Sequence, residues 1–112
     1  MATSKRKMLI LGSTAYETKI KELQGILESM GHDVRIPMFD TIEGATEMDT
    51  AVYNRDLIEW CDEVHLVWDG RSLGTMFNLG MSFALKKPLV INYLEPKNFI
   101  TFIKRYSELY RL

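Results

Sequence analysis

Short apolar runs alternate with amphipathic segments along the chain, and this alternation constrains the fold more than any other feature of the sequence. The apolar runs cover residues 7–12, 63–68 and 88–93, and a further strand-like run covers residues 32–37. Segments with apolar residues at helical spacing cover residues 16–30, 49–61, 75–85 and 99–110. Strands that alternate with helices of this length are typical of a parallel sheet with right-handed crossovers. We therefore expect a small doubly wound α/β domain of the flavodoxin or Rossmann kind, with helices on both faces of its sheet.

Local signals place the ends of several elements and indicate the order of the strands. Gly31 closes the first helical segment, and Asp49 is the expected N-cap of the second. The run at 32–37 is short, half polar and ended by Pro37, which predicts a strand toward the edge of the sheet. We expect the strand order 2-1-3-4, in which the direction of winding reverses between the first and third strands.

Length and composition limit the kinds of partner. At 112 residues the chain is expected to form one domain, residues 1–112, and a complete active site could require a second subunit. A net charge of -1 argues against nucleic acid or an acidic membrane as a partner. No apolar stretch reaches the length of a membrane span. The lone cysteine and the absence of a signal-like N-terminus predict a cytoplasmic protein.

Two polar loops follow the strands that flank the reversal, where doubly wound sheets bind their ligands. The first loop covers residues 12–16. Its glycine, Gly12, allows a ligand to approach the backbone, and Ser13 and Thr14 offer hydroxyl groups beside a helix N-terminus. Gly12 and Ser13 would also serve as ordinary turn and cap residues. The loop alone therefore leaves both interpretations open.

The second loop, WDGRSLGT at residues 68–75, carries charged groups suited to a sugar or a phosphate. Asp69 could accept hydrogen bonds from ribose hydroxyls, and Arg71 could pair with an anion through two hydrogen bonds. Gly70 and Gly74 would also serve as turn residues. Neither loop has the glycine spacing of a dinucleotide fingerprint or of a phosphate-binding loop. Two such loops at one reversal point favour a binding site for a ligand that carries a sugar or a phosphate, and we expect no cofactor and no metal.

A set of positions in the second half of the chain matches the signature of a known enzyme superfamily, in order: Asp62, Asp69, Gly70, Gly74, Thr75, Gly80, Ala84, Lys87 and Pro88. With these positions, the sequence resembles the nucleoside 2-deoxyribosyltransferase superfamily, which includes the deoxynucleoside monophosphate N-glycosidases. The resemblance extends from Lys7 to Tyr93. It implies cleavage of an N-glycosidic bond or transfer of a deoxyribosyl group, in which a glutamate on a helix attacks the anomeric carbon.

Asn78 occupies the position that matches this glutamate. A neutral amide is a very poor nucleophile, although it can bind ribose hydroxyls as both donor and acceptor. With the helix starting near Thr75, residue 78 is expected in its first turn. The resemblance also implies that Asp69 orients the sugar and that Tyr16 lies near the nucleophile, although an aromatic residue at the start of a helix equally often serves packing. The expected catalytic positions are therefore Asn78, Asp69 and Tyr16.

The residues expected to bind the substrate lie on both loops and at the start of the following helix. They are Gly12, Ser13, Thr14, Asp69, Gly70, Arg71, Ser72, Gly74, Thr75 and Asn78. His32 and His65 are too far apart in the pattern to form a metal-ligand set, and His65 is expected to be buried or to have its hydrogen bonds satisfied. Exposed aromatic residues near the site, Tyr53, Phe77 and Tyr93, suggest that a second copy in a homodimer or larger oligomer closes the pocket.

Three explanations for Asn78 stay open at the level of sequence. The chain could be a non-catalytic sensor, sequestering protein or interaction module for nucleotide derivatives. The nucleophile could instead be Asp69 or an acid of the loop that carries Asp40, Glu43 and Glu47. The asparagine could also be a substitution introduced to trap a complex. Catalysis is left open, because fold alone does not separate an enzyme from a receptor.

Overall fold

Strands and helices alternate as the sequence predicts. The computed structural model describes residues 5–37, 46–68, 73–94 and 100–110. The strands are β1 (Lys7–Gly12), β2 (Asp33–Arg35), β3 (Glu63–Trp68) and β4 (Leu89–Leu94). The helices are α1 (Glu17–Ser29), α2 (Glu47–Trp60), α3 (Leu73–Ala84) and α4 (Ile100–Leu109), with a short 3-10 turn, η1 (Thr14–Tyr16), before α1. No helix in this described part of the chain is long and apolar enough to cross a membrane.

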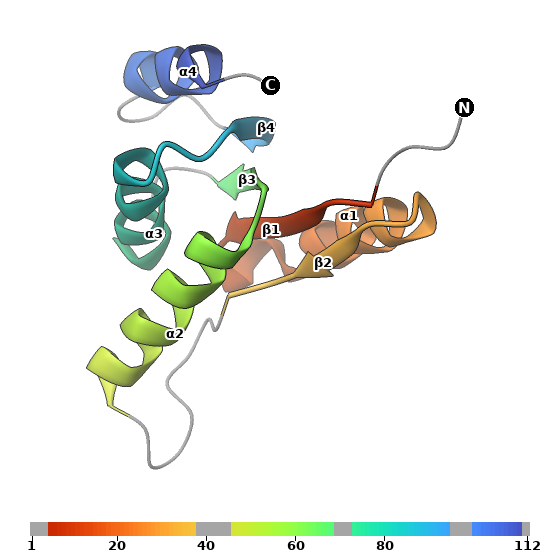
Figure 1. The fold of residues 1–112 in the computed structure, drawn as a ribbon, viewed down its shortest axis with the longest axis horizontal. Coiled ribbons are helices and arrows are strands. Elements are labelled where there is room, and N and C mark those ends of the chain that lie inside the picture. The colour runs from red at the N-terminus through yellow and green to blue at the C-terminus, as the bar shows by residue number, and fades with distance from the viewer. Residues whose placement is uncertain (1–4, 38–45, 69–72, 95–99, 111–112) are drawn as a thin grey trace.

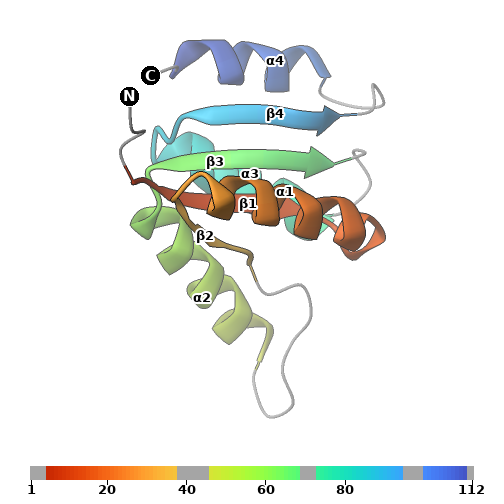
Figure 2. The ribbon, with the colours of Figure 1, turned by 90° about the vertical axis from the view of Figure 1, so that its right-hand side faces the viewer.

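The strands form one parallel sheet in the predicted order, β2-β1-β3-β4. α1 covers one face, and α2 and α3 cover the other, with α4 beside β4 (Figures 1 and 2). The short strand β2 lies at the edge, as its polar residues and Pro37 indicate. The predicted α/β fold, its strand order and the presence of helices on both faces are therefore confirmed.

The sheet separates two apolar clusters of different size. The larger lies under α2, α3 and α4 and includes the fully buried side chains of Leu9, Leu66 and Trp68. The smaller lies under α1 and includes Ile10 and Ile20. Consecutive residues of β1 and β3 contribute to opposite clusters, because side chains alternate between the faces of a strand.

The ends of α1 and α2 have clear local causes. Gly31 has φ +94°, which ends α1 in a conformation that glycine adopts at little cost. The expectation that Asp49 caps α2 was wrong. Thr46 is the N-cap, its hydroxyl accepts a hydrogen bond from the Asp49 N–H at 3.0 Å, and the Asp49 carboxylate accepts one from the Thr46 N–H at 2.9 Å. This reciprocal capping box holds the pKa of the Asp49 carboxyl below its usual value.

Lys87 links α2, β4 and α4. Its Nζ donates hydrogen bonds to the carbonyls of Glu59 and Cys61, at 3.0 and 2.7 Å, where α2 ends. The Tyr106 hydroxyl on α4 donates to the Lys87 carbonyl at 2.9 Å. One residue between α3 and β4 thus satisfies the last carbonyls of α2 and anchors α4.

A bulge interrupts the pairing of β4 with β3. Ile91 pairs with Leu66, but the next residue of β3, Val67, pairs with Tyr93, so Asn92 is the extra residue. The Asn92 amide lies 2.9 Å from His65 Nδ1, and the Tyr93 ring packs on Tyr16, so both side chains contact residues on the α1 side of the sheet. A bulge that redirects a side chain in this way is common beside functional sites.

Candidate functional site

The two predicted loops follow neighbouring strands at their carboxyl ends, because β1 ends at Gly12 and β3 ends at Trp68. Residues 12–16 and α3, from Leu73 onward, belong to the described part of the chain. Asp69, Gly70, Arg71 and Ser72 lie outside the described residues, as do Asp40 and Glu43. The part of the candidate site that the structure describes therefore consists of the first loop and the start of α3, together with the neighbouring end of β4.

Gly12 has a structural role that its sequence context did not reveal. A Cβ atom at this position would lie 2.5 Å from the Val67 carbonyl oxygen and 2.6 Å from Ile20 Cδ1. Both distances are too short for a real contact, so a side chain here would push α1 or β3 away. Gly12 is therefore needed for close packing at the end of β1, whether or not a ligand also approaches its backbone.

The residues after Gly12 form a tight turn into α1. The Tyr16 N–H donates a hydrogen bond to the Ser13 carbonyl at 3.0 Å, which closes η1. Ser13 is partly buried, and the Thr14 side chain lies outside the described part of the structure. The Tyr16 ring is half-buried and packs on Tyr93, with 5.1 Å between ring centroids and an angle of 44° between ring planes.

Tyr93 was predicted to be an exposed aromatic residue near the site, and the structure corrects this. Its side chain is half-buried between the β4 bulge and Tyr16, and Lys19 Nζ lies 5.0 Å from the centroid of its ring. Tyr53 and Phe77 are exposed as predicted, at 48% and 59%. The contact between Lys19 and Tyr93 was missed, because the bulge that turns Tyr93 toward α1 has no local sequence signal.

On α3, the buried face carries polar residues at the end nearer the loop. Thr75 is 3% exposed and Asn78 is 9% exposed, and both lie on the same face as Leu79 and Ser82. The Ser82 hydroxyl donates to the Asn78 carbonyl at 2.9 Å. Gly74 is exposed within the helix rather than in a turn, because α3 begins at Leu73. Asn78 consequently lies in the second turn, not the first as expected.

Within the described part of the chain, no hydrogen bond to the Asn78 side-chain amide is seen. Two other polar side-chain atoms among these residues, His65 Nε2 and Trp68 Nε1, are fully sealed from solvent and have no hydrogen-bond partner. Asn78 retains 9% of its surface exposed, so a water molecule or a ligand can reach part of this residue. Buried polar groups in folded proteins nearly always have a partner, which makes this amide a candidate contact for a ligand.

His65 is buried, as predicted, on the α1 side of the sheet. Burial lowers the pKa of its imidazole, although the Glu63 carboxylate, with Oε1 2.8 Å from Nε2, acts in the opposite direction. Glu63 also pairs with Arg6 at 3.2 Å. His65 thus belongs to a polar strip that runs from Arg6, just before β1, across β3 to Asn92 on β4.

Other described residues offer little replacement chemistry. Burial raises the pKa of the Cys61 thiol to about 11, so the thiolate needed for nucleophilic attack is scarce at neutral pH. Glu47, the described acid of the proposed alternative loop, is exposed in the first turn of α2. Among the described residues, no group of three or more histidine, cysteine, aspartate or glutamate side chains could hold a metal ion.

No protein-family model and no curated protein sequence matches this chain. Among solved structures, the chain is similar to the structure of Clostridium botulinum CMP N-glycosidase, BcmB, with a TM-score of 0.67. The match covers 95% of this chain and 83% of that chain, at 18% sequence identity. At that identity the likeness is one of fold. The chain therefore shares its α/β architecture with an enzyme that is named for its action on CMP.

Proposed function

We propose that the protein binds a nucleoside or nucleotide at the carboxyl ends of β1 and β3, with Asn78 in contact with the sugar. The observation that carries this proposal is the Asn78 amide, which is 9% exposed and has no hydrogen-bond partner among the described residues. An amide can donate to one ribose hydroxyl and accept from another. The sequence resemblance to the deoxyribosyltransferase superfamily and the fold likeness to a CMP N-glycosidase both support a nucleotide as the ligand class.

Cleavage of an N-glycosidic bond is the reaction that the sequence resemblance implies for this site. We infer that the chain performs this reaction slowly or not at all. Attack on the anomeric carbon requires a carboxylate, and Asn78 supplies a neutral amide in its place. A non-catalytic sensor or sequestering protein for nucleotides is therefore a second candidate function. Asn78 favours this second function, because its amide can form hydrogen bonds with the ligand but cannot attack the anomeric carbon.

The experiment compares the unmodified protein with Asn78→Glu and, as a matched control, Asn78→Gln. Release of free base from cytidine, deoxycytidine, CMP and dCMP would be followed by chromatography. We expect release only from Asn78→Glu, because this variant restores a carboxylate while Asn78→Gln adds the same length without charge. Rapid release by the unmodified protein would contradict the proposed loss of the nucleophile and would direct attention to Asp69.

Burial should make the activity of Asn78→Glu depend on pH. A carboxyl group introduced at this position would be desolvated, which raises its pKa. The helix dipole would offset this only weakly, because Asn78 lies in the second turn of α3 and the dipole effect falls off beyond the first turn. Base release by the variant should therefore increase as pH rises through the raised pKa of the new carboxyl.

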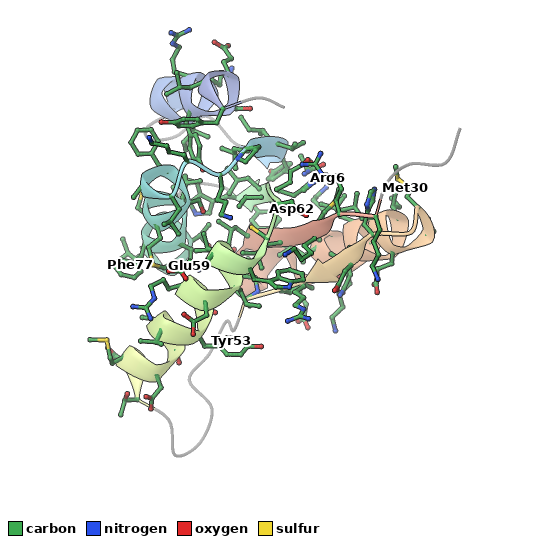
Figure 3. The ribbon with its side chains drawn as sticks, in the orientation of Figure 1. Arg6, Met30, Tyr53, Glu59, Asp62 and Phe77 are labelled. Carbon is green, nitrogen blue, oxygen red and sulfur yellow. The ribbon has the colours of Figure 1, made fainter. Side chains whose placement is uncertain are left out.

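We further infer that a second copy of the chain packs against α3. Leu73 and Phe77 lie one turn apart on this helix and are 85% and 59% exposed. Tyr53 does not belong to the same surface, because Figure 3 draws it on the opposite side of α2 from Phe77. Light scattering should give the mass of a dimer for the unmodified protein and that of a monomer for Phe77→Asp. A monomer for both proteins would contradict this assembly.

A further inference from the structure

A lysine, two tyrosines and a bulge lie together beside the first loop of the candidate site. The register of the sheet places Gly12, Val67 and Tyr93 in one row across β1, β3 and β4. Gly12 and Tyr93 therefore lie two strands apart, or roughly 10 Å, at the carboxyl ends of their strands. Tyr16 fills the space on the α1 side by packing on Tyr93.

The bulge at Asn92 determines where the Tyr93 ring lies. Without the extra residue, Tyr93 would follow the alternation of Leu89 and Ile91 and face the large apolar cluster. With it, Tyr93 turns to the α1 side and joins the small cluster with Tyr16. The strand thus departs from regular pairing at the position that presents this ring beside the candidate site.

Lys19 extends from the first turn of α1, and its Nζ lies 5.0 Å from the Tyr93 ring centroid. The electron-rich face of the ring attracts the ammonium group and restricts where it lies. Within the described part of the chain, no carboxylate pairs with Lys19, whereas Lys21 pairs with Glu17 at 3.2 Å. A positive charge in the first turn of a helix also gains nothing from the helix dipole. The charge of Lys19 is therefore held in position without being neutralised.

From this arrangement, which rests on the proposed nucleotide site, we propose that Lys19 reads the anionic group of the ligand. The ligand class is then a nucleoside 5′-phosphate rather than a free nucleoside. Lys19 contacts the phosphate, and Tyr93 acts as a positioning residue that holds the ammonium at the edge of the site. This role is independent of Arg71, the residue that the sequence alone indicated for the phosphate.

The test is calorimetric titration of the unmodified protein, Lys19→Met and Lys21→Met with CMP and with cytidine. Methionine keeps the length of the side chain and removes its charge, and Lys21 is a matched control on the same helix. We expect Lys19→Met to weaken CMP binding by roughly 10- to 100-fold, the scale of one charge-assisted hydrogen bond, and to leave cytidine binding unchanged. Lys21→Met should change neither affinity. Tyr93→Leu should weaken CMP binding by a smaller factor, because the ammonium stays but loses its fixed position.

Each outcome separates this inference from the function on which it rests. If CMP binds to the unmodified protein and Lys19→Met binds it equally well, the role of Lys19 is overturned while the nucleotide site stands. Equal losses for CMP and cytidine would also overturn it, because the effect would not depend on the phosphate. If neither CMP nor cytidine binds to the unmodified protein, the proposed function fails, and the role of Lys19 fails with it.

Discussion

The two faces of the sheet are built differently. The face under α2, α3 and α4 is apolar across β1, β3 and β4, and it encloses the largest buried side chains, including Trp68 and Tyr106. On the opposite face α1 packs on β1 and β2, and part of the remaining surface is polar, with Glu63, His65 and Asn92. The contrast indicates that one face supplies most of the stability, while the other carries polar side chains on β3 and β4.

Truncation of core residues should show the largest difference between the faces. Leu66 is fully buried in the large cluster, whereas Leu27 is 7% exposed in the small one. Replacing either leucine by alanine removes the same atoms, but the cost rises with the size of the cavity left behind. We expect Leu66→Ala to lower the free energy of unfolding by about 4–5 kcal/mol and Leu27→Ala by about 2 kcal/mol, as measured by urea denaturation. Equal losses would contradict the contrast between the faces.

An intermediate effect is expected at Gly12, where α1 and β3 meet. Gly12→Ala would place a Cβ atom 2.5 Å from the Val67 carbonyl oxygen, a backbone atom that cannot rotate away. Overpacking of this kind costs about 1–3 kcal/mol. Gly25→Ala is the matched control, because no atom lies within 4 Å of its Cβ and the change should stabilise α1 by about 0.5–1 kcal/mol. Thermal unfolding of both variants would test this, and a neutral Gly12→Ala would show that α1 adjusts freely.

The smallest effect concerns pH and the polar strip. Burial lowers the pKa of His65 in the folded protein below its ordinary value of 6.5, although Glu63 opposes this shift. Below about pH 6.5 the unfolded chain therefore binds a proton that the folded chain excludes. The stability that His65 contributes is complete above this pH and is lost as pH falls toward the lowered pKa.

Urea midpoints at pH 7.5 and 5.5 would measure this effect. We expect the difference between the two midpoints to be smaller for His65→Gln than for the unmodified protein. Asn92→Ala is the control, because it removes the side chain 2.9 Å from Nδ1 but keeps the titrating ring. If His65→Gln kept the full difference, another group would be responsible for it.

The sequence predicted the sheet, its order and the burial of His65, because apolar periodicity and turn residues are local signals. It misplaced the cap of α2, since Thr46 and Asp49 bond reciprocally and either residue type suits the role. It placed Asn78 one turn too early, because α3 already begins at Leu73.

Features that depend on contacts between distant segments were beyond the reach of the sequence. The steric role of Gly12 depends on Val67 and Ile20, which approach it only in the folded chain. The pairing of Tyr93 with Tyr16 and Lys19 depends on a one-residue bulge, and a strand with a bulge has no distinct composition. The predicted roles of Asp69 and Arg71 stay predictions, because both residues lie outside the described part of the chain.

Lys87 belongs to the signature that resembles the deoxyribosyltransferase superfamily, and its structural role affects what a match at this position means. Its hydrogen bonds to the carbonyls of Glu59 and Cys61 assemble the fold and have no part in the proposed chemistry. A descendant that had lost all catalysis would therefore still be selected to keep this lysine. A lysine shared at position 87 therefore indicates that two chains have the same fold. The residue at position 78 carries far more information about whether they catalyse the same reaction.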